Sequence, residues 1–169
     1  VDLSRKENYW STSAAVIRIK DNRFEWLQTG DCTIILIYRD HSHKVLVEQD
    51  NHDHETLMMW KKEAEKGKTG IREILTDQIK KVRSGMNRDY GVLNGEKAAE
   101  AFLNYGHESL DNVSEILLFT DGLAIPTDTP EKSKSFENLV DLYLSIGLDG
   151  LKDRIRSMDS LISTPPSSL

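Results

Sequence analysis

Two carboxylates stand where an apolar, strand-like segment meets a glycine. Asp31 directly follows Gly30, and Asp121 directly precedes Gly122. Carboxylates held at strand ends are a usual means by which a β-scaffold binds a hard metal ion such as Mg²⁺ or Mn²⁺. The glycines would allow the backbone or a ligand to approach closely. Asp-Gly is also a common turn signal, so these residues alone indicate either a metal site or two strand-ending turns.

The elements that would position these residues follow from the spacing of apolar side chains. Alternating or continuous β-rich runs predict strands over 13–20, 23–29, 32–38, 44–48 and 113–120. The first four succeed one another through turns, which predicts one antiparallel sheet in meander order. Helical spacing predicts helices over 54–66, 71–83, 135–146 and 150–157, with the first two forming an antiparallel pair on the sheet. The segment 90–93 reads as a short strand, and 96–105 as a helix or as a strand near Phe102.

Composition narrows the class of protein. The 169 residues are 38% hydrophobic and 30% charged, which is typical of one globular domain; we expect that domain to span 1–169, with 163–169 a flexible tail or a truncated connection. A net charge of −6 argues against a nucleic-acid partner. No apolar run approaches the roughly 20 residues of a membrane span, and we expect no membrane partner. The single cysteine, Cys32, excludes an internal disulfide, which fits a cytoplasmic protein.

Three short motifs occur in a fixed order along the chain. Thr12-Ser13-Ala14-Ala15 opens the first strand, Gly30-Asp31-Cys32 follows the second, and Thr120-Asp121-Gly122-Leu123 ends the last. In this order the chain resembles the metal-dependent protein serine/threonine phosphatases of type 2C, which carry a Thr/Ser-Ala strand, a Gly-Asp-Ser turn and a Ser/Thr-Asp-Gly-Leu strand end. The resemblance covers about residues 11–123.

The resemblance implies an α+β fold, with an antiparallel β-sandwich flanked by helices and a two-metal site at one end. In that family Mg²⁺ or Mn²⁺ activates a water that attacks a phosphoserine or phosphothreonine of a phosphoprotein substrate. By this likeness Asp121 is a metal ligand and Asp31 an accessory ligand or water positioner. Gly30 and Gly122 allow the backbone to approach the site.

The sequence also departs from the family pattern. The family's first metal-binding motif, Asp-Gly, lies upstream of the Thr/Ser-Ala strand, but only Asp2 and Glu7 are acidic before Ser13. The last motif, Asp-Asp/Asn-x-Thr, is absent as well. The resemblance therefore implies a core segment, incomplete at both ends and inactive on its own, of an active parent enzyme. The alternative is a catalytically inactive phosphatase-like module with a binding or regulatory role.

A second polar segment, Asp50-Asn51-His52-Asp53-His54-Glu55, could also be read as a metal site. We favour a polar loop that leads into a helix with Asp53 as its N-cap. The chain has no phosphate-binding loop of the Gly-x-x-x-x-Gly-Lys-Ser/Thr type and no Gly-x-Ser-x-Gly motif. The lysines at 61, 62, 66 and 68 alternate with acids and predict a solvated helix face, and the three tryptophans predict packing in or near the core.

Overall fold

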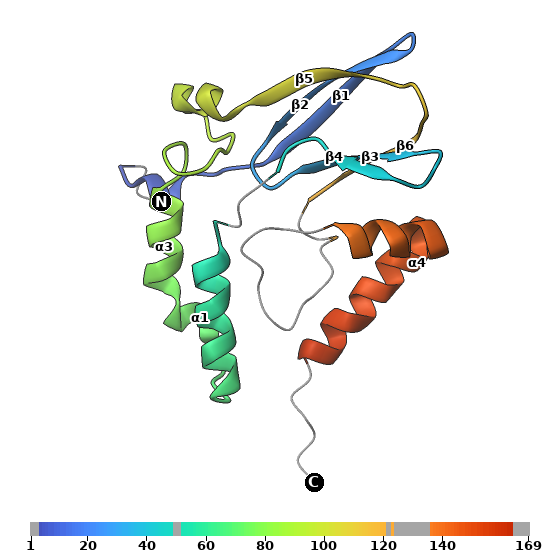
Figure 1. The fold of residues 1–169 in the computed structure, drawn as a ribbon. Coiled ribbons are helices and arrows are strands. Elements are labelled where there is room, and N and C mark those ends of the chain that lie inside the picture. Colours follow the sequence, from blue (N-terminus) through green and yellow to red (C-terminus); the bar gives the residue numbers. More distant parts are fainter. Residues whose placement is uncertain (1–3, 49–51, 121–122, 124–135, 164–169) are drawn as a thin grey trace.

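The computed structural model describes residues 4–48, 52–120, 123 and 136–163, and combines helices with two small antiparallel sheets (Figure 1). The strands are β1 (Ala14–Lys20), β2 (Arg23–Thr29), β3 (Thr33–Tyr38), β4 (His43–Val45), β5 (Asn104–Ser109) and β6 (Val113–Phe119). The helices are α1 (His54–Glu65), α2 (Ile71–Ile74), α3 (Thr76–Ser84) and α4 (Glu137–Ser163), with short 3-10 turns η1 (Lys6–Asn8) and η2 (Lys97–Phe102).

The strands pair in the orders β1-β2-β5 and β4-β3-β6. The strand positions predicted from the sequence are largely confirmed, but the prediction of one meander sheet is wrong. Gly30, at φ +67°, turns the chain out of the first sheet after β2, and β3 begins in the second. The free edge of β2 pairs instead with β5, in a stretch that the sequence left open between helix and strand. There the 3-10 turn η2 ends at Phe102 and the strand begins at Asn104.

The two sheets lie one above the other (Figure 1). Lys44 of β4 donates a hydrogen bond of 2.9 Å to the carboxylate of Glu108 on β5, so the contact joins one sheet to the other. In the strand register Lys44 lies opposite Leu36, and Glu108 lies opposite Phe24. Leu36 and Phe24 are both buried. Since partners opposite one another share a face, these two faces are turned toward each other.

Helix α4 covers the other face of the second sheet (Figure 1). Ile35 and Ile37 of β3 are fully buried and form a cluster with Val140 of this helix. The helix changes direction at Gly147, which has φ +69° and ψ −179°. The predicted break between two C-terminal helices is therefore confirmed, and the second part packs through Leu151 and Ile155.

Helices α1 and α3 lie side by side, joined by Glu55, which accepts a hydrogen bond from Gln78 and forms an ion pair with Lys81. The predicted helix pair is confirmed, with a break at Leu75, but its placement on a sheet is wrong. Figure 1 shows both helices projecting away from the strands. Leu57, Met58, Met59 and Trp60 are consecutive and each 39–43% exposed. Successive helical residues are about 100° apart, so α1 has no single apolar stripe to lay on a sheet.

Of the three tryptophans, Trp26 is half-buried, as predicted. Trp10 is 88% exposed, because it lies in the connection between η1 and β1, and Trp60 is 43% exposed, so both pack less than the sequence predicts. Cys32 is buried, as expected of a small apolar side chain. The solvated lysine face is confirmed: Lys66 and Lys68 both pair with Glu63, and Lys61 pairs with Glu65.

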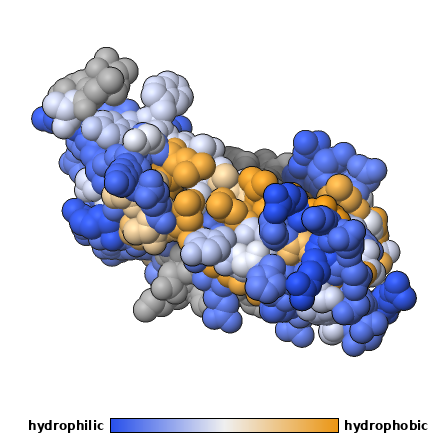
Figure 2. Space-filling model, turned by 90° about the horizontal axis from the view of Figure 1, so that it is seen from above, coloured by the Kyte–Doolittle hydropathy of each residue, from blue (hydrophilic) through white to orange (hydrophobic). Residues whose placement is uncertain are grey.

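The upper face of the β1-β2-β5 sheet is not covered by any described residue (Figure 2). Apolar side chains gather in the middle of this face between charged groups. In the strand register Val16, Leu27 and Tyr105 form one cross-strand row, and Arg18 and Glu25 lie in the next. Among the described helices, none has the length and apolar character needed to cross a membrane.

Candidate functional site

The first two motifs meet at the turn between β2 and β3. The backbone N–H of Asp31 donates a hydrogen bond of 3.1 Å to Ser13 Oγ, which lies just before β1. Gly30 has φ +67°, and a Cβ at this position would lie 2.3 Å from Ser13 Oγ and 3.1 Å from Ser13 Cα. Only glycine fits such an approach, so the Thr-Ser-Ala and Gly-Asp-Cys motifs form one local structure.

A buried amide holds this turn from the other side. Gln28 Nε2 donates hydrogen bonds of 2.7 Å to the carbonyl oxygens of both Gly30 and Cys32. Gln28 Oε1 accepts a bond of 3.0 Å from Asn104 of β5. The turn is thus fixed to the neighbouring strand, and the Asp31 side chain projects from a rigid base.

Strand β6, which leads into the third motif, ends close to the turn that carries Asp31. Phe119, the last residue of β6, lies opposite Thr33, which follows Asp31 by two residues. The chain therefore leaves β6 at the end of the sheet where Asp31 lies. Asp121 and Gly122 themselves lie outside the described residues, and their predicted roles remain predictions.

His52 and Asp53 approach Asp31 and form a cluster that the sequence did not bring together. His52 Nδ1 lies 3.6 Å from an oxygen of Asp31, and His52 Nε2 lies 3.6 Å from an oxygen of Asp53. The imidazole stacks on the ring of Tyr90, with centroids 4.0 Å apart and planes 9° from parallel. The side chains of Asp31 and His52 are 35% and 23% exposed, so the cluster is open to small solutes.

Asp53 does stand at the N-cap position of α1, as predicted, but its side chain makes no capping hydrogen bond. It turns toward His52 instead. The sequence signal for this arrangement is the dense run of acids and histidines at 50–55. Its proximity to Asp31 depends on the tertiary fold and has no local signature.

The loop that supplies Tyr90 is held by the buried side chain of Asn87. Asn87 Oδ1 accepts a hydrogen bond from the backbone N–H of Val92, and Asn87 Nδ2 donates to Asn94 and Glu96. The hydrogen bond from Asn94, followed by that from Lys6, lowers the pKa of Glu96. Burial raises the pKa of the Tyr90 hydroxyl, and the charge of Asp53 raises it further. Tyr90 therefore presents a neutral ring to His52 at neutral pH.

A pocket of about 290 Å³ lies beside the Asp31 turn. Gly30, Asp31 and His52 line it together with Tyr90 and Asn104. The pocket therefore joins the Gly-Asp motif to the stacked histidine.

A profile of the family described as Protein phosphatase 2C matches residues 4–156 of this sequence. The chain belongs to the protein phosphatase 2C family. No curated protein and no solved structure gives a significant match. The family match includes all three motifs, both sheets and most of α4. It confirms the resemblance found in the sequence, and the family it identifies is one of metal-dependent phosphatases.

The metal dependence of the family can be tested against the donor atoms in this chain. Asp31, His52 and Asp53 each offer one ligand atom, and these atoms all lie within 4.8 Å of one another. Mg²⁺ holds its ligands at about 2.1 Å, so opposite ligands of one ion are about 4 Å apart. A small rotation of these side chains would bring them to a common cation. The described residues therefore fit a divalent metal.

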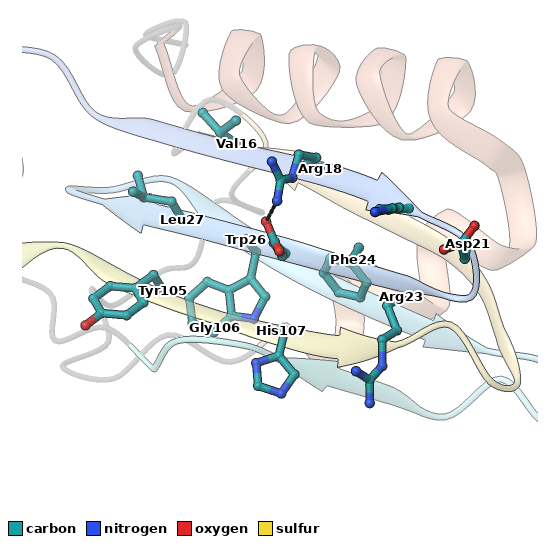
Figure 3. A pocket seen from close by; sticks show the side chains of 12 residues that line it. Val16, Arg18, Asp21, Arg23, Phe24, Trp26, Leu27, Tyr105, Gly106 and His107 are labelled. Atoms are coloured by element: carbon teal, nitrogen blue, oxygen red, sulfur yellow. Dashed lines mark ion pairs between the residues drawn. The ribbon is translucent and has the colours of Figure 1, made fainter.

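A second, larger hollow of about 1100 Å³ lies on the uncovered face of the β1-β2-β5 sheet. Figure 3 shows Val16, Leu27 and Tyr105 toward one end of this hollow and Arg23 toward the other. Arg18 and Glu25 form an ion pair of 2.5 Å between them. Among the described residues, none of the three motifs or of the Asp31–His52–Asp53 cluster lines this hollow, so the smaller pocket is the candidate site.

Proposed function

We propose that this chain carries the core of a metal-dependent protein phosphatase that hydrolyses phosphoserine or phosphothreonine with Mg²⁺ or Mn²⁺. The observation that carries the proposal is the meeting of the motifs within a family match. Ser13 and Gly30 are in contact, Asp31 projects beside them, and β6 ends opposite Thr33. Independent motifs that meet at one pocket are the arrangement expected of a catalytic site.

We infer further that the two stacked sheets are the β-sandwich of the family. The Lys44–Glu108 contact between them and the buried residues Phe24 and Leu36 on the facing sides support this. A β-sandwich of this kind collects strand ends at each of its two ends. The metal-binding carboxylates would then share one end.

Asp31 and Asp121 take the roles of metal ligands in this proposal. Asp31 lies two residues before Thr33 and Asp121 two residues after Phe119, and Thr33 and Phe119 are register partners. The two carboxylates therefore leave paired strands at equal distances along the chain. Gly30 and Gly122 leave room for the backbone at the site. A bound divalent ion would lower the pKa of a water ligand and neutralise charge on the phosphate.

The other residues hold the site in place. Ser13 accepts the hydrogen bond from the Asp31 backbone, and Gln28 ties together the carbonyls on both sides of Asp31. Fixed ligands avoid the cost of ordering carboxylates when the ion binds. The buried single cysteine, Cys32, fits the reducing conditions of the cytoplasm, where we place the protein.

A catalytically inactive phosphatase-like module is the second candidate. The observation in its favour is that the cluster of described residues around Asp31 offers two carboxylates, Asp31 and Asp53. Mg²⁺ requires a nearly complete octahedral shell, so a site with few carboxylates would bind it weakly. In that case the pocket would bind a phosphorylated partner without hydrolysing it.

Hydrolysis of an aryl phosphate and of phosphoserine and phosphothreonine peptides tests the proposal. The assay uses the full-length protein with Mn²⁺ or Mg²⁺ and compares Asp121→Asn and Asp31→Asn with the wild type. We expect Asp121→Asn to lower kcat/KM roughly 100-fold or more, because a metal ligand supports several kcal/mol of charge stabilisation.

The matched control is Asp149→Asn, an exposed α4 carboxylate that pairs with Lys152, which should leave the rate unchanged. Undiminished activity in Asp121→Asn would remove that residue from the mechanism. A folded full-length protein that binds phosphopeptides but releases no phosphate would favour the inactive module.

A further inference from the structure

We propose that His52, which lies outside the three family motifs, is a ligand of the ion held by Asp31, and that Asp53 orients its ring. The imidazole would bind the ion through Nδ1, while Nε2–H donates to the Asp53 carboxylate. The inference rests on the proposed function, because it extends the same metal site. It adds a nitrogen ligand to a site otherwise made of carboxylates.

The distances support this division of roles. Nδ1 is the nitrogen that faces Asp31, at 3.6 Å, and Nε2 is the nitrogen that faces Asp53, also at 3.6 Å. Two ligands at right angles on one ion are about 3 Å apart when each bond is about 2.1 Å. If His52 Nδ1 and the Asp31 oxygen moved about half an ångström closer together, both atoms would therefore be placed to bind one ion.

The environment of the ring fixes its orientation. Tyr90 stacks on His52 almost in parallel, which restricts rotation of the imidazole. Tyr90 is in turn placed by the loop that Asn87 braces. A carboxylate on the second nitrogen of a metal-binding histidine is the usual device that sets its tautomer and strengthens its bond to the metal. The Asp53 carboxylate is available for this role because it makes no capping hydrogen bond to the end of α1.

A nitrogen ligand changes the choice of ion. Mg²⁺ prefers oxygen ligands and keeps much of its water shell, whereas imidazole favours first-row transition ions. The site at Asp31 should therefore select Mn²⁺ over Mg²⁺. Replacement of His52 by a residue that offers only oxygen should reduce that preference.

The test is direct binding of MnCl₂ to the 169-residue chain, followed by electron paramagnetic resonance. We expect electron spin-echo modulation from a coordinated ¹⁴N in the wild type. This signal should disappear in His52→Gln, the Kd for Mn²⁺ should rise about tenfold, and the preference for Mn²⁺ over Mg²⁺ in competition should narrow by a similar factor. His107→Gln is the matched control, because His107 lies on β5 at the uncovered face, and it should change none of these measurements.

Two further variants separate orientation from ligation. Tyr90→Phe keeps the stacked ring and should retain the nitrogen signal, whereas Tyr90→Ala should weaken Mn²⁺ binding several-fold. Asp53→Ala should weaken it about 10-fold to 100-fold, the usual effect of losing a partner of a metal ligand.

The inference is overturned if the wild type with Mn²⁺ bound shows no nitrogen modulation, or if His52→Gln leaves the signal intact. A histidine that only pairs with the two carboxylates would give the first result. The binding measurements need no turnover. A nitrogen signal in a full-length protein without phosphatase activity would thus uphold this inference and refute the proposed function, and phosphatase activity of the full-length protein without the signal would do the reverse.

Discussion

Replacement of Gly30 by alanine should lower the stability of the protein in two ways, both at the turn that carries Asp31. The first is the backbone conformation, φ +67°, which an L-residue adopts only with strain. The second is the added Cβ, which would lie 2.8 Å from Ser13 Cβ and 3.1 Å from Ser13 Cα. Ser13 Cα is a backbone atom and Ser13 Cβ is bonded directly to it, so rotation of the Ser13 side chain cannot relieve these two contacts.

The magnitude follows from these two terms. The left-handed conformation costs an L-residue about 1–2 kcal/mol. Forcing an extra carbon into a packed site costs about 1–3 kcal/mol. Gly30→Ala should therefore lower the free energy of unfolding by about 2–5 kcal/mol, a large part of the roughly 5–15 kcal/mol that stabilises a typical domain.

Gly67 supplies the matched control. It has φ +70°, and apart from its chain neighbours no described residue has a heavy atom within 4 Å of where its Cβ would be. Gly67→Ala should carry the backbone cost alone, about 1–2 kcal/mol. Urea unfolding of both variants, with unchanged m values, measures the difference.

A Gly30→Ala variant no less stable than Gly67→Ala would refute the close contact with Ser13. Ser13→Gly in the Gly30→Ala background provides a second check, because it removes the crowding side chain. It should recover part of the loss in Gly30→Ala, whereas in the wild type it should destabilise by removing the acceptor for the Asp31 N–H.

Two further predictions concern the helices. Hydrogen bonds from Lys66 and then Lys68 lower the pKa of Glu63 to about 2 from 4.5, so these ion pairs should be complete above about pH 4.5 and their contribution to stability lost as the pH falls toward 2. Carboxyl ¹³C titration should show this low pKa, with a clear rise in Lys66→Met and none in Lys62→Met; an ordinary pKa in the wild type would contradict the pairing. In α4, Gly147→Ala should cost about 1–3 kcal/mol, because φ +69° with ψ −179° is a region that essentially only glycine occupies. Thermal unfolding should then shift downward by about 2–4 °C per kcal/mol, and an unchanged midpoint would place the bend elsewhere.

The sequence predicts the strands and helices well, because their patterns are local. The predicted strand over 23–29 coincides with β2, Arg23–Thr29, and the one predicted over 32–38 contains β3, Thr33–Tyr38. The partner of β2 was not predictable in the same way. β5 begins at Asn104, about 75 residues further along the chain, and its own residues Asn104 and Gly106 are weak strand formers.

The candidate site, like the sheets, could be predicted from the sequence only where the signal is local. Asp31 was found from its place beside a glycine at a strand end, and Gly30 proves to be required by the approach of Ser13. His52 and Asp53 were assigned to a polar loop and a helix cap, since their residue types fit those roles equally well. Only the tertiary arrangement brings the imidazole between Asp31 and Asp53.

The incorrect prediction of one sheet and the position of Asp31 have one physical cause. A meander would require the chain to reverse within one sheet after Thr29, and the residues between β2 and β3 would then form an ordinary hairpin. The left-handed Gly30, pressed against Ser13, instead carries the chain from one sheet to the other. A carboxylate in that crossing stands at the common end of both sheets, next to β1 through Ser13 and next to β6 through the Thr33–Phe119 pair. A hairpin would have left Asp31 beside its neighbours in one sheet, whereas the crossing gives it access to residues from distant parts of the chain, which a metal site requires.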